Sequence, residues 1–352
     1  FQEERGGISN YIESLYRELL KLDKKNDYVF FQPRKERKIG NTRVIKTLGG
    51  KMIGGFLFDN FLVNNLARKE KIDIFHAPSN ILPVFGEAKT KYILTVHDLA
   101  FLKIPQAYNP IYTGYYKLNL KRSLKKADII IADSKSTKND IIEFYKIKES
   151  KIRVIYLGID NDFWRVNYKK RIIKQRYFFS VATHPKRKNI LGTLKAFAHN
   201  NHLNNLKYVI VGTIFDKEYR KELNETIEKL GLSDKVVILG YVEKEDLINL
   251  YQNAEFFIYP SLYEGFGFPV IEAMALKCPV IASNNSSLPE LVPNKKWLID
   301  PYNIKDIKCK MEKIVNLSQK EKDRLINTNY VFAKKFTWER AALKMINIFN
   351  CL

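Results

Sequence analysis

The sequence is poor in cysteine and has no apolar run long enough to cross a membrane. Its three cysteines among 352 residues, Cys278, Cys309 and Cys351, all lie in the second half and lack the close spacing of metal ligands. A sparse, odd-numbered set of this kind predicts reduced thiols in a cytoplasmic compartment. Apolar runs such as residues 129–131 and 256–258 have strand length, far below the ~20 residues of a membrane helix. The sequence therefore predicts neither a disulfide scaffold nor a membrane span.

Acidic residues are also in short supply. Lys and Arg number 60 against 38 Asp and Glu, which gives a net charge of +22. Basic clusters at residues 34–38 and 121–126 could attract nucleic acid or an anionic membrane surface, or could reflect a lysine-rich composition without function. Because no nucleic-acid motif accompanies them, we expect no nucleic-acid partner. Peripheral attachment at the inner face of a membrane fits the charge better.

Apolar segments of strand length alternate with helical segments twice along the chain. The predicted strands are residues 27–31, 72–75, 92–96, 128–131 and 152–155 in the first half, and residues 177–181, 208–211, 236–239, 256–258 and 279–282 in the second. This alternation predicts an α/β chain of two doubly wound domains, residues 1–168 and 169–335, joined at the charged stretch 168–176. Ligands of such sheets bind beyond the carboxyl ends of the strands, so we expect the site in the cleft between the domains.

The most informative segment is Glu264-Gly265-Phe266-Gly267-Phe268-Pro269-Val270-Ile271-Glu272. It follows an apolar strand and leads into a helix-forming run. A strand that turns through glycines into a helix presents backbone N–H groups and partial positive charge at one spot, which suits a phosphate or sugar hydroxyls. Glu264 and Glu272 can then reach different parts of one extended ligand. On spacing alone, a solvated loop glutamate and a helix-surface glutamate fit equally well.

This segment resembles the donor-site motif of retaining GT-B glycosyltransferases of glycosyltransferase family 4. The matching positions are Glu264, Gly265, Phe266, Gly267, Pro269 and Glu272. The resemblance implies a GT-B fold, in which two Rossmann-like domains face a cleft and a C-terminal helix, here residues 336–352, crosses back to the first domain. It also implies that Glu264 faces the transferred sugar and Glu272 holds the nucleotide ribose. The backbone from Gly265 to Phe268 would then meet the diphosphate.

A basic run after the strand at residues 177–181 is the second half of the predicted phosphate site. Arg187 and Lys188 precede a helical segment, where they could stabilise the charge that leaves with a nucleoside diphosphate. By itself, a basic cluster is more often a solvated face. The family usually carries a lysine at the position of Lys188 and an arginine beside it or earlier. This chain has Thr183 at the earlier position, so Arg187 is the remaining candidate.

Three more residues complete the predicted site. His97 ends a predicted strand; such a histidine often binds only nearby backbone, but the resemblance implies that it binds and orients the donor sugar. Gly7 lies in a glycine turn before a helix, and in the family this turn borders the donor phosphates. Relatives place a short strand ahead of the turn, so we expect the numbering to begin inside the fold, after that strand. Tyr241 follows the strand at residues 236–239, where relatives contact the base.

Together these features predict a retaining hexosyltransferase. It would move mannose, glucose, rhamnose or a similar hexose from a nucleoside diphosphate sugar to a lipid-linked or polysaccharide acceptor in cell-surface glycan synthesis. We expect no cofactor and no metal, because the chain lacks a convincing Asp-x-Asp metal element and offers Arg187 and Lys188 instead. The alternatives are a basic protein that binds nucleic acid or membrane on a Rossmann-like scaffold, and a GT-B sugar-nucleotide epimerase, which needs no acceptor. The donor base and the linkage stay open.

Overall fold

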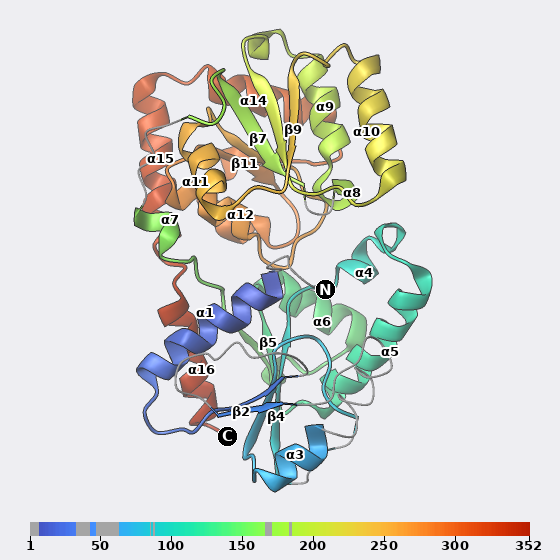
Figure 1. The fold of residues 1–352 in the computed structure, drawn as a ribbon, viewed down its shortest axis with the longest axis vertical. Coiled ribbons are helices and arrows are strands. Elements are labelled where there is room, and N and C mark those ends of the chain that lie inside the picture. Colours follow the sequence, from blue (N-terminus) through green and yellow to red (C-terminus); the bar gives the residue numbers. More distant parts are fainter. Residues whose placement is uncertain are drawn as a thin grey trace. The chain divides into compact units, whose positions relative to one another are not determined.

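The chain forms two compact units in a computed structural model that describes residues 7–32, 43–46, 63–84, 86, 89–165, 171–182 and 185–352 (Figure 1). Unit 1 comprises residues 1–99, 108–158 and 337–352, and unit 2 comprises residues 100–107 and 159–336. The predicted boundary at 168/169 and the basic cluster at 34–38 fall outside the described residues. The break itself lies at 158/159.

The position of this break follows from the contacts of the segment after Gly158. The backbone N–H of Ile159 donates to the carbonyl of Phe336, and the carboxylates of Asp160 and Asp162 lie 3.2 and 2.6 Å from Lys244 Nζ. All of these partners belong to unit 2. The start of unit 2 therefore precedes the charged stretch that the sequence suggested as the linker.

Unit 1 is built on a parallel sheet in the order β3-β4-β5-β6. Its strands are β3 (Ile74–Ala77), β4 (Lys91–Val96), β5 (Ile129–Ala132) and β6 (Ile152–Val154), and a separate parallel pair is formed by β1 (Val29–Gln32) and β2 (Arg43–Lys46). In β4, Ile93, Leu94 and Val96 are fully buried, as expected for a central parallel strand covered on both faces. The five strands predicted for the first half are confirmed to within two residues at their starts, and β2 was not predicted.

Helices and one short 3-10 turn complete unit 1: α1 (Gly7–Leu22), α3 (Val63–Lys69), α5 (Pro110–Lys126), α6 (Lys135–Tyr145), η3 (Glu149–Lys151) and α16 (Trp338–Phe349). The last of these, α16, packs along α1. Thr337 caps it, because its side chain accepts a hydrogen bond from the backbone N–H of Arg340 at 3.2 Å. The backbone at Gly158 passes close to the start of α16, since a Cβ on Gly158 would come within 2.1 Å of the backbone nitrogen of Trp338. Only glycine fits there.

Unit 2 holds a six-stranded parallel sheet in the order β12-β11-β10-β7-β8-β9. The strands are β7 (Tyr177–Val181), β8 (Lys207–Val211), β9 (Val236–Gly240), β10 (Phe257–Tyr259), β11 (Val280–Ser283) and β12 (Leu298–Ile299). Counted from β7, this is the Rossmann order, in which the chain reverses direction across the sheet between β7 and β10. The rings of Tyr208, Phe178 and Phe256 stack across neighbouring strands, with centroids 4.7 and 4.8 Å apart.

The helices of unit 2 are α4 (Ala100–Lys103), α7 (Asp162–Arg165), α8 (Pro185–Lys188), α9 (Ile190–Ala198), α10 (Lys217–Lys229), α11 (Lys244–Asn253), α12 (Phe268–Ala275), α13 (Leu288–Leu291), α14 (Ile304–Val315) and α15 (Gln319–Ala333). Short 3-10 turns stand at η2 (Pro105–Ala107), η4 (Asn201–Leu203) and η5 (Lys295–Trp297). Around the sheet, α9 packs on α10 and α14, and α12 packs on α15. Among the described residues, no helix has both the length and the apolar character that a membrane crossing requires.

Candidate active site

The predicted phosphate-binding residues lie where the strand order of unit 2 reverses. Arg187 and Lys188 end α8, which follows β7, and Glu264 lies in the loop between β10 and α12. Because β7 and β10 are adjacent and parallel, both loops leave the same carboxyl edge of the sheet. Open α/β sheets bind ligands at such a switch point. Thr183 and His184, which precede α8, fall outside the described residues.

Glu264 is the centre of a buried polar cluster. Lys188 Nζ donates to Glu264 Oε1 and to the hydroxyl of Tyr259, and Ser261 Oγ donates to the same carboxylate oxygen at 2.6 Å. The second oxygen, Oε2, lies 3.8 Å from Nη2 of Arg187. Lys188 and Glu264 are only 4% and 6% exposed. Sequence reasoning found the three charged residues but missed Tyr259 and Ser261, which carry no charge to single them out.

Two cations around one carboxylate fix the charge of this cluster. Burial opposes ionisation of Glu264, but the charges of Arg187 and Lys188 and the hydrogen bonds to Lys188 and Ser261 lower its pKa to about 2. Glu264 is therefore a carboxylate at neutral pH and has no proton to give as a general acid. One positive charge remains in excess, which favours an anionic ligand.

The Glu264 loop is held in place from the turn after β11. The backbone N–H of Glu264 donates to Ser286 Oγ at 3.0 Å, and Ser287 Oγ donates to the carbonyl oxygens of Glu264 and Phe266. Gly267 ends the loop with a φ of 122°, a conformation that side chains rarely adopt, and it precedes the first residue of α12. The N-terminus of α12 adds the positive end of a helix dipole to the edge that carries Arg187 and Lys188.

Glu272 lies in α12, about one turn after its first residue, Phe268. Its side chain is half-buried. The hydroxyl of Tyr251 donates to its Oε2 at 3.3 Å. Burial, with the nearby charge of Asp160, raises the pKa of Glu272 to about 7, while Tyr251 and Lys244 act in the opposite direction. Near neutral pH, Glu272 therefore exists in both its protonated and its ionised form. Asp160 and Lys244 were not predicted as neighbours of Glu272, because no local motif contains them.

Exposed aromatic residues follow two neighbouring strands of the same sheet. Tyr241 comes directly after β9 and is 58% exposed, and Phe215, four residues after β8, is 70% exposed. The two strands are hydrogen-bonded, and Gly212 N–H donates to the carbonyl of Gly240 at 2.6 Å. Only Tyr241 was predicted as a site residue. The part of Tyr241 in donor binding stays a prediction.

His97 follows β4 in unit 1, at the carboxyl end expected from the sequence. Its Nδ1 lies 2.7 Å from Oδ2 of Asp133, and its Nε2 lies 2.8 Å from the carbonyl oxygen of Pro78. The Pro78 carbonyl can only accept, so Nε2 donates to it, and Nδ1 donates to Asp133 when that residue is a carboxylate. Burial opposes that charge, but Asp133, the Pro78 carbonyl and Asp98 raise the pKa of His97.

Asp133 was not predicted, although its place in the chain offered a signal. It directly follows β5, the neighbour of β4, so its side chain leaves the same sheet edge as His97. Tyr11, one turn after Gly7 in α1, covers His97 with its ring centroid 4.8 Å away in an edge contact. Gly7 itself is the first described residue of α1, and the turn before it lies outside the described residues.

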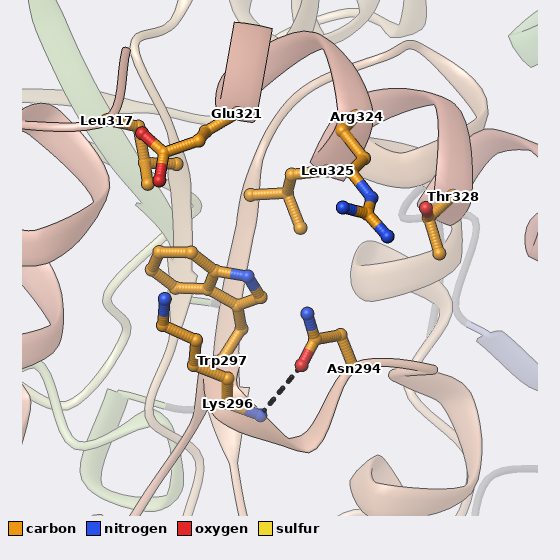
Figure 2. A pocket seen from close by; sticks show the side chains of 8 residues that line it. All are labelled: Asn294, Lys296, Trp297, Leu317, Glu321, Arg324, Leu325 and Thr328. Carbon is orange, nitrogen blue, oxygen red and sulfur yellow. Dashed lines mark hydrogen bonds between the residues drawn. The ribbon is translucent and has the colours of Figure 1, made fainter.

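The hollow drawn in Figure 2 is a different place in unit 2. It has a volume of about 330 Å³ and is lined by Asn294, Lys296, Trp297, Leu317, Glu321, Arg324, Leu325 and Thr328, between η5 and α15. Its polar groups serve the local fold: Lys296 N–H donates to Asn294 Oδ1 at 3.1 Å, and Glu321 accepts from Ser318 in the cap of α15. None of the predicted site residues lines it.

Comparison with known proteins agrees with these features. A family model described as "Glycosyltransferase Family 4" matches residues 5–163, and one described as "Glycosyl transferases group 1" matches residues 162–331. O-antigen chain mannosyltransferase B of Escherichia coli is 30% identical over 295 residues, which cover 81% of this chain and 76% of that protein. The chain belongs to glycosyltransferase family 4. It is a glycosyltransferase enzyme, as the motif at residues 264–272 predicted.

One further curated protein and one solved structure are similar to this family 4 chain. O-antigen chain mannosyltransferase RfbU of Salmonella typhimurium is 30% identical over 224 residues, 64% of this chain and 61% of that protein. The crystal structure of Anabaena HepE in complex with UDP and glucose superposes with a TM-score of 0.74 over 99% of this chain and 97% of that one, at 17% identity. At this identity the likeness establishes the fold alone. The predicted GT-B fold of two Rossmann-like units is confirmed.

Proposed function

We propose that this chain transfers a hexose, with mannose as the first choice, from a nucleoside diphosphate sugar to a growing cell-surface glycan, and that the anomeric configuration is retained. The single observation that carries the proposal is the buried cluster of Lys188, Arg187 and Glu264 at the switch point of unit 2. The sugar is suggested by relatives named O-antigen mannosyltransferases. A lipid-linked acceptor agrees with the basic surface of the chain.

The cluster suits a leaving diphosphate. When the glycosidic bond breaks, negative charge grows on the phosphate oxygen, and fixed cations lower the energy of that state more than that of the bound donor. Arg187 and Lys188 are held before the donor arrives, because the backbone carbonyl of Arg187 accepts from Leu262 N–H and Lys188 is bound to Tyr259 and Glu264. Removing one such fixed charge typically lowers kcat by about 10²- to 10³-fold.

The geometry of Glu264 supports a role in holding the sugar rather than attacking it. One carboxylate oxygen accepts from Lys188 and Ser261, and the other faces Arg187. A carboxylate stabilised in this way is a weak nucleophile, so a covalent glycosyl intermediate on Glu264 is disfavoured. We propose the front-face route: the bond to the acceptor oxygen forms on the side from which the diphosphate leaves. The departing phosphate takes the acceptor proton.

The other predicted site residues receive separate roles. We propose that Glu272 accepts hydrogen bonds from the ribose hydroxyls, which favours its ionised form. Tyr241 and the Gly265–Phe268 backbone would contact the base and the diphosphate. His97 keeps the sugar-orienting role that the family resemblance implies. Because its Nε2 already donates to the Pro78 carbonyl, a sugar hydroxyl would share or replace that bond. We propose that Arg187 and Lys188 meet the diphosphate charge without a required divalent metal.

The proposal is tested first by ligand binding and then by product analysis. A thermal-shift panel of UDP, GDP, ADP and dTDP sugars should single out one nucleotide, because a ligand at one hundred times its Kd stabilises the folded state by about 2.7 kcal/mol. Transfer from that donor to a lipid-linked glycan is then followed by proton NMR of the fresh product. The same anomeric configuration in donor and product is expected.

Other products would contradict the proposal. An inverted configuration would overturn retention, and a donor epimer formed without any acceptor would favour an epimerase. If no nucleotide sugar stabilised a folded and monodisperse sample, the proposed donor site would be wrong.

A further inference from the structure

Helix α5 has a composition that sets it apart from the rest of the chain. Its sequence, PIYTGYYKLNLKRSLKK, holds five basic residues and no acidic one. The acid-free stretch is longer than the helix, since the chain has no Asp or Glu between Asp98 and Asp128. Three tyrosines lie among the cations. Nothing in the proposed donor chemistry requires this composition.

The inner face of α5 is accounted for by packing in unit 1. Leu120, Ser123 and Leu124 are fully buried. Ser123 Oγ accepts from the backbone N–H of Leu82 at 2.9 Å, and Lys126 Nζ donates to the carbonyl of Pro83 at 2.7 Å. These bonds anchor the C-terminal half of the helix to the segment before β4.

The outer face is apolar where a solvated helix would be polar. Ile111 is 85% exposed, Leu118 is 71% exposed and Tyr115 is 44% exposed. Their spacing of four and then three residues places them on one stripe of the helix. Single exposed apolar residues are ordinary, but Ile111 has the largest exposure of any big apolar side chain among the described residues, and its stripe continues into two exposed lysines, Lys121 and Lys125.

We propose that the outer face of α5 docks on an anionic lipid surface (Figure 1). Ile111, Tyr115 and Leu118 enter the headgroup layer, and Lys121 and Lys125 bind lipid phosphates. Apolar and aromatic side chains next to lysines are the pattern of helices that lie in the membrane interface. This assignment rests on the proposed function, because a lipid-linked acceptor lies at a membrane. It places the contact with the lipid on one face of one helix.

Charge decides between a lipid surface and the other possible occupants. A second copy of this chain would bring another face without acidic residues against the first, and like charges would oppose the contact. RNA or DNA would satisfy the lysines but would leave Ile111 and Leu118 without an apolar partner. An anionic bilayer satisfies both kinds of side chain.

The test is sedimentation of the purified protein with lipid vesicles. The wild type should bind vesicles made of equal parts phosphatidylglycerol and phosphatidylcholine, and bind phosphatidylcholine alone at least tenfold more weakly. Ile111→Gln with Leu118→Gln should weaken binding to the mixed vesicles about tenfold or more, since two apolar insertions are lost. Lys121→Gln with Lys125→Gln should weaken it about 25-fold.

A matched control uses exposed apolar residues in other helices. Val331 and Leu343 are 54% and 46% exposed, and the double change to Gln there should leave vesicle binding within twofold of the wild type. Affinity for the donor nucleotide should be unchanged in every variant, which separates this inference from the proposed function. Equal loss in the control pair would overturn the assignment of α5. Two further results would overturn it. In the first, the wild type is a dimer, and Ile111→Gln with Leu118→Gln converts it to monomers that still bind vesicles. In the second, the wild type binds RNA, and the lysine variant loses RNA binding but keeps vesicle binding.

Discussion

Each unit places a buried group of charged residues at the same kind of position, and the two groups differ in net charge. In unit 1, His97 after β4 meets Asp133 after β5, and the pair is neutral overall. In unit 2, Glu264 after β10 meets two cations, Lys188 and Arg187, after β7, and one positive charge is left over. Both groups stand at the carboxyl edge of adjacent parallel strands.

Strand topology therefore supplies the place of each group, and the loop residues supply its chemistry. A neutral pair can orient a ring but attracts no anion, whereas a cluster with a surplus cation can hold a diphosphate. We therefore assign anion binding to unit 2 and orientation of a neutral group to unit 1. Three substitutions and the removal of metal test that division.

Replacement of Lys188 should do the most damage. Lys188→Met removes the buried cation from Glu264, so kcat should fall about 10³-fold because the leaving phosphate loses a fixed charge. The free energy of unfolding should fall by about 3–5 kcal/mol, because a buried carboxylate is left with weaker compensation. Steady-state kinetics and urea unfolding measure the two effects.

A double variant separates these two causes. Lys188→Met with Glu264→Gln removes both charges, so most of the lost stability should return while transfer stays at the level of the single variant. A double variant that recovers activity together with stability would show that Lys188 acts only as a structural partner.

Glu272 should control how nucleotide affinity depends on pH. Its raised pKa of about 7 means that the free enzyme carries a proton there below neutrality, whereas ribose binding favours the carboxylate. Affinity for the nucleoside diphosphate should therefore rise between about pH 6 and 8 and level off above. In Glu272→Gln the rise should vanish, and affinity at the upper pH should be weaker by about 1.5–3 kcal/mol. Calorimetry at several pH values would refute this role if the variant kept the wild-type profile.

Asp133 offers the matching test in unit 1. Asp133→Asn removes the charge that raises the pKa of His97, so burial should leave the imidazole neutral. A histidine whose pKa is raised in the folded state stabilises the fold at pH values below its unfolded-state pKa, and this stabilisation is lost as the pH rises through the folded-state pKa. The variant should therefore have a lower free energy of unfolding than the wild type at acid pH. We expect kcat to fall about tenfold and donor affinity to stay within twofold. Histidine NMR titration would check the pKa, and a large loss of donor affinity would argue against the neutral role of unit 1.

Removal of divalent metal should have the smallest effect. If Arg187, Lys188 and the N-terminus of α12 meet the diphosphate charge, transfer should survive chelation by EDTA within about twofold. A strict requirement for added Mg²⁺ or Mn²⁺ would contradict that part of the proposal.

Much of the architecture was predictable because buried parallel strands leave continuous apolar runs in the sequence. Those runs located β1 and the strands from β3 to β11. The strand β12 has only two residues, too few for an apolar run, and β2 holds only two apolar residues between Arg43 and Lys46. The break at 158/159 rests on contacts of Ile159 and Asp160 with residues far along the chain, which no local run of the sequence displays.

The site was predictable where a local pattern marks it and not where distant residues complete it. Glu264, Gly267 and Lys188 stand in recognisable local runs. Asp133, Tyr259 and Asp160 act through partners far along the chain, at separations of 36 residues for the bond of Asp133 to His97 and 71 for that of Tyr259 to Lys188. Contacts of that kind depend on which strands are neighbours in the sheet, and strand order cannot be deduced from local sequence patterns.

The most direct test of the division between the units is calorimetric titration of the donor. The mannose nucleotide that the thermal-shift panel selects is titrated into the wild type, Lys188→Met and Asp133→Asn. We expect Lys188→Met to weaken binding at least tenfold and Asp133→Asn to bind like the wild type. A Lys188→Met protein that is folded and binds the donor with unchanged affinity would contradict the assignment of the diphosphate to the Lys188, Arg187 and Glu264 cluster.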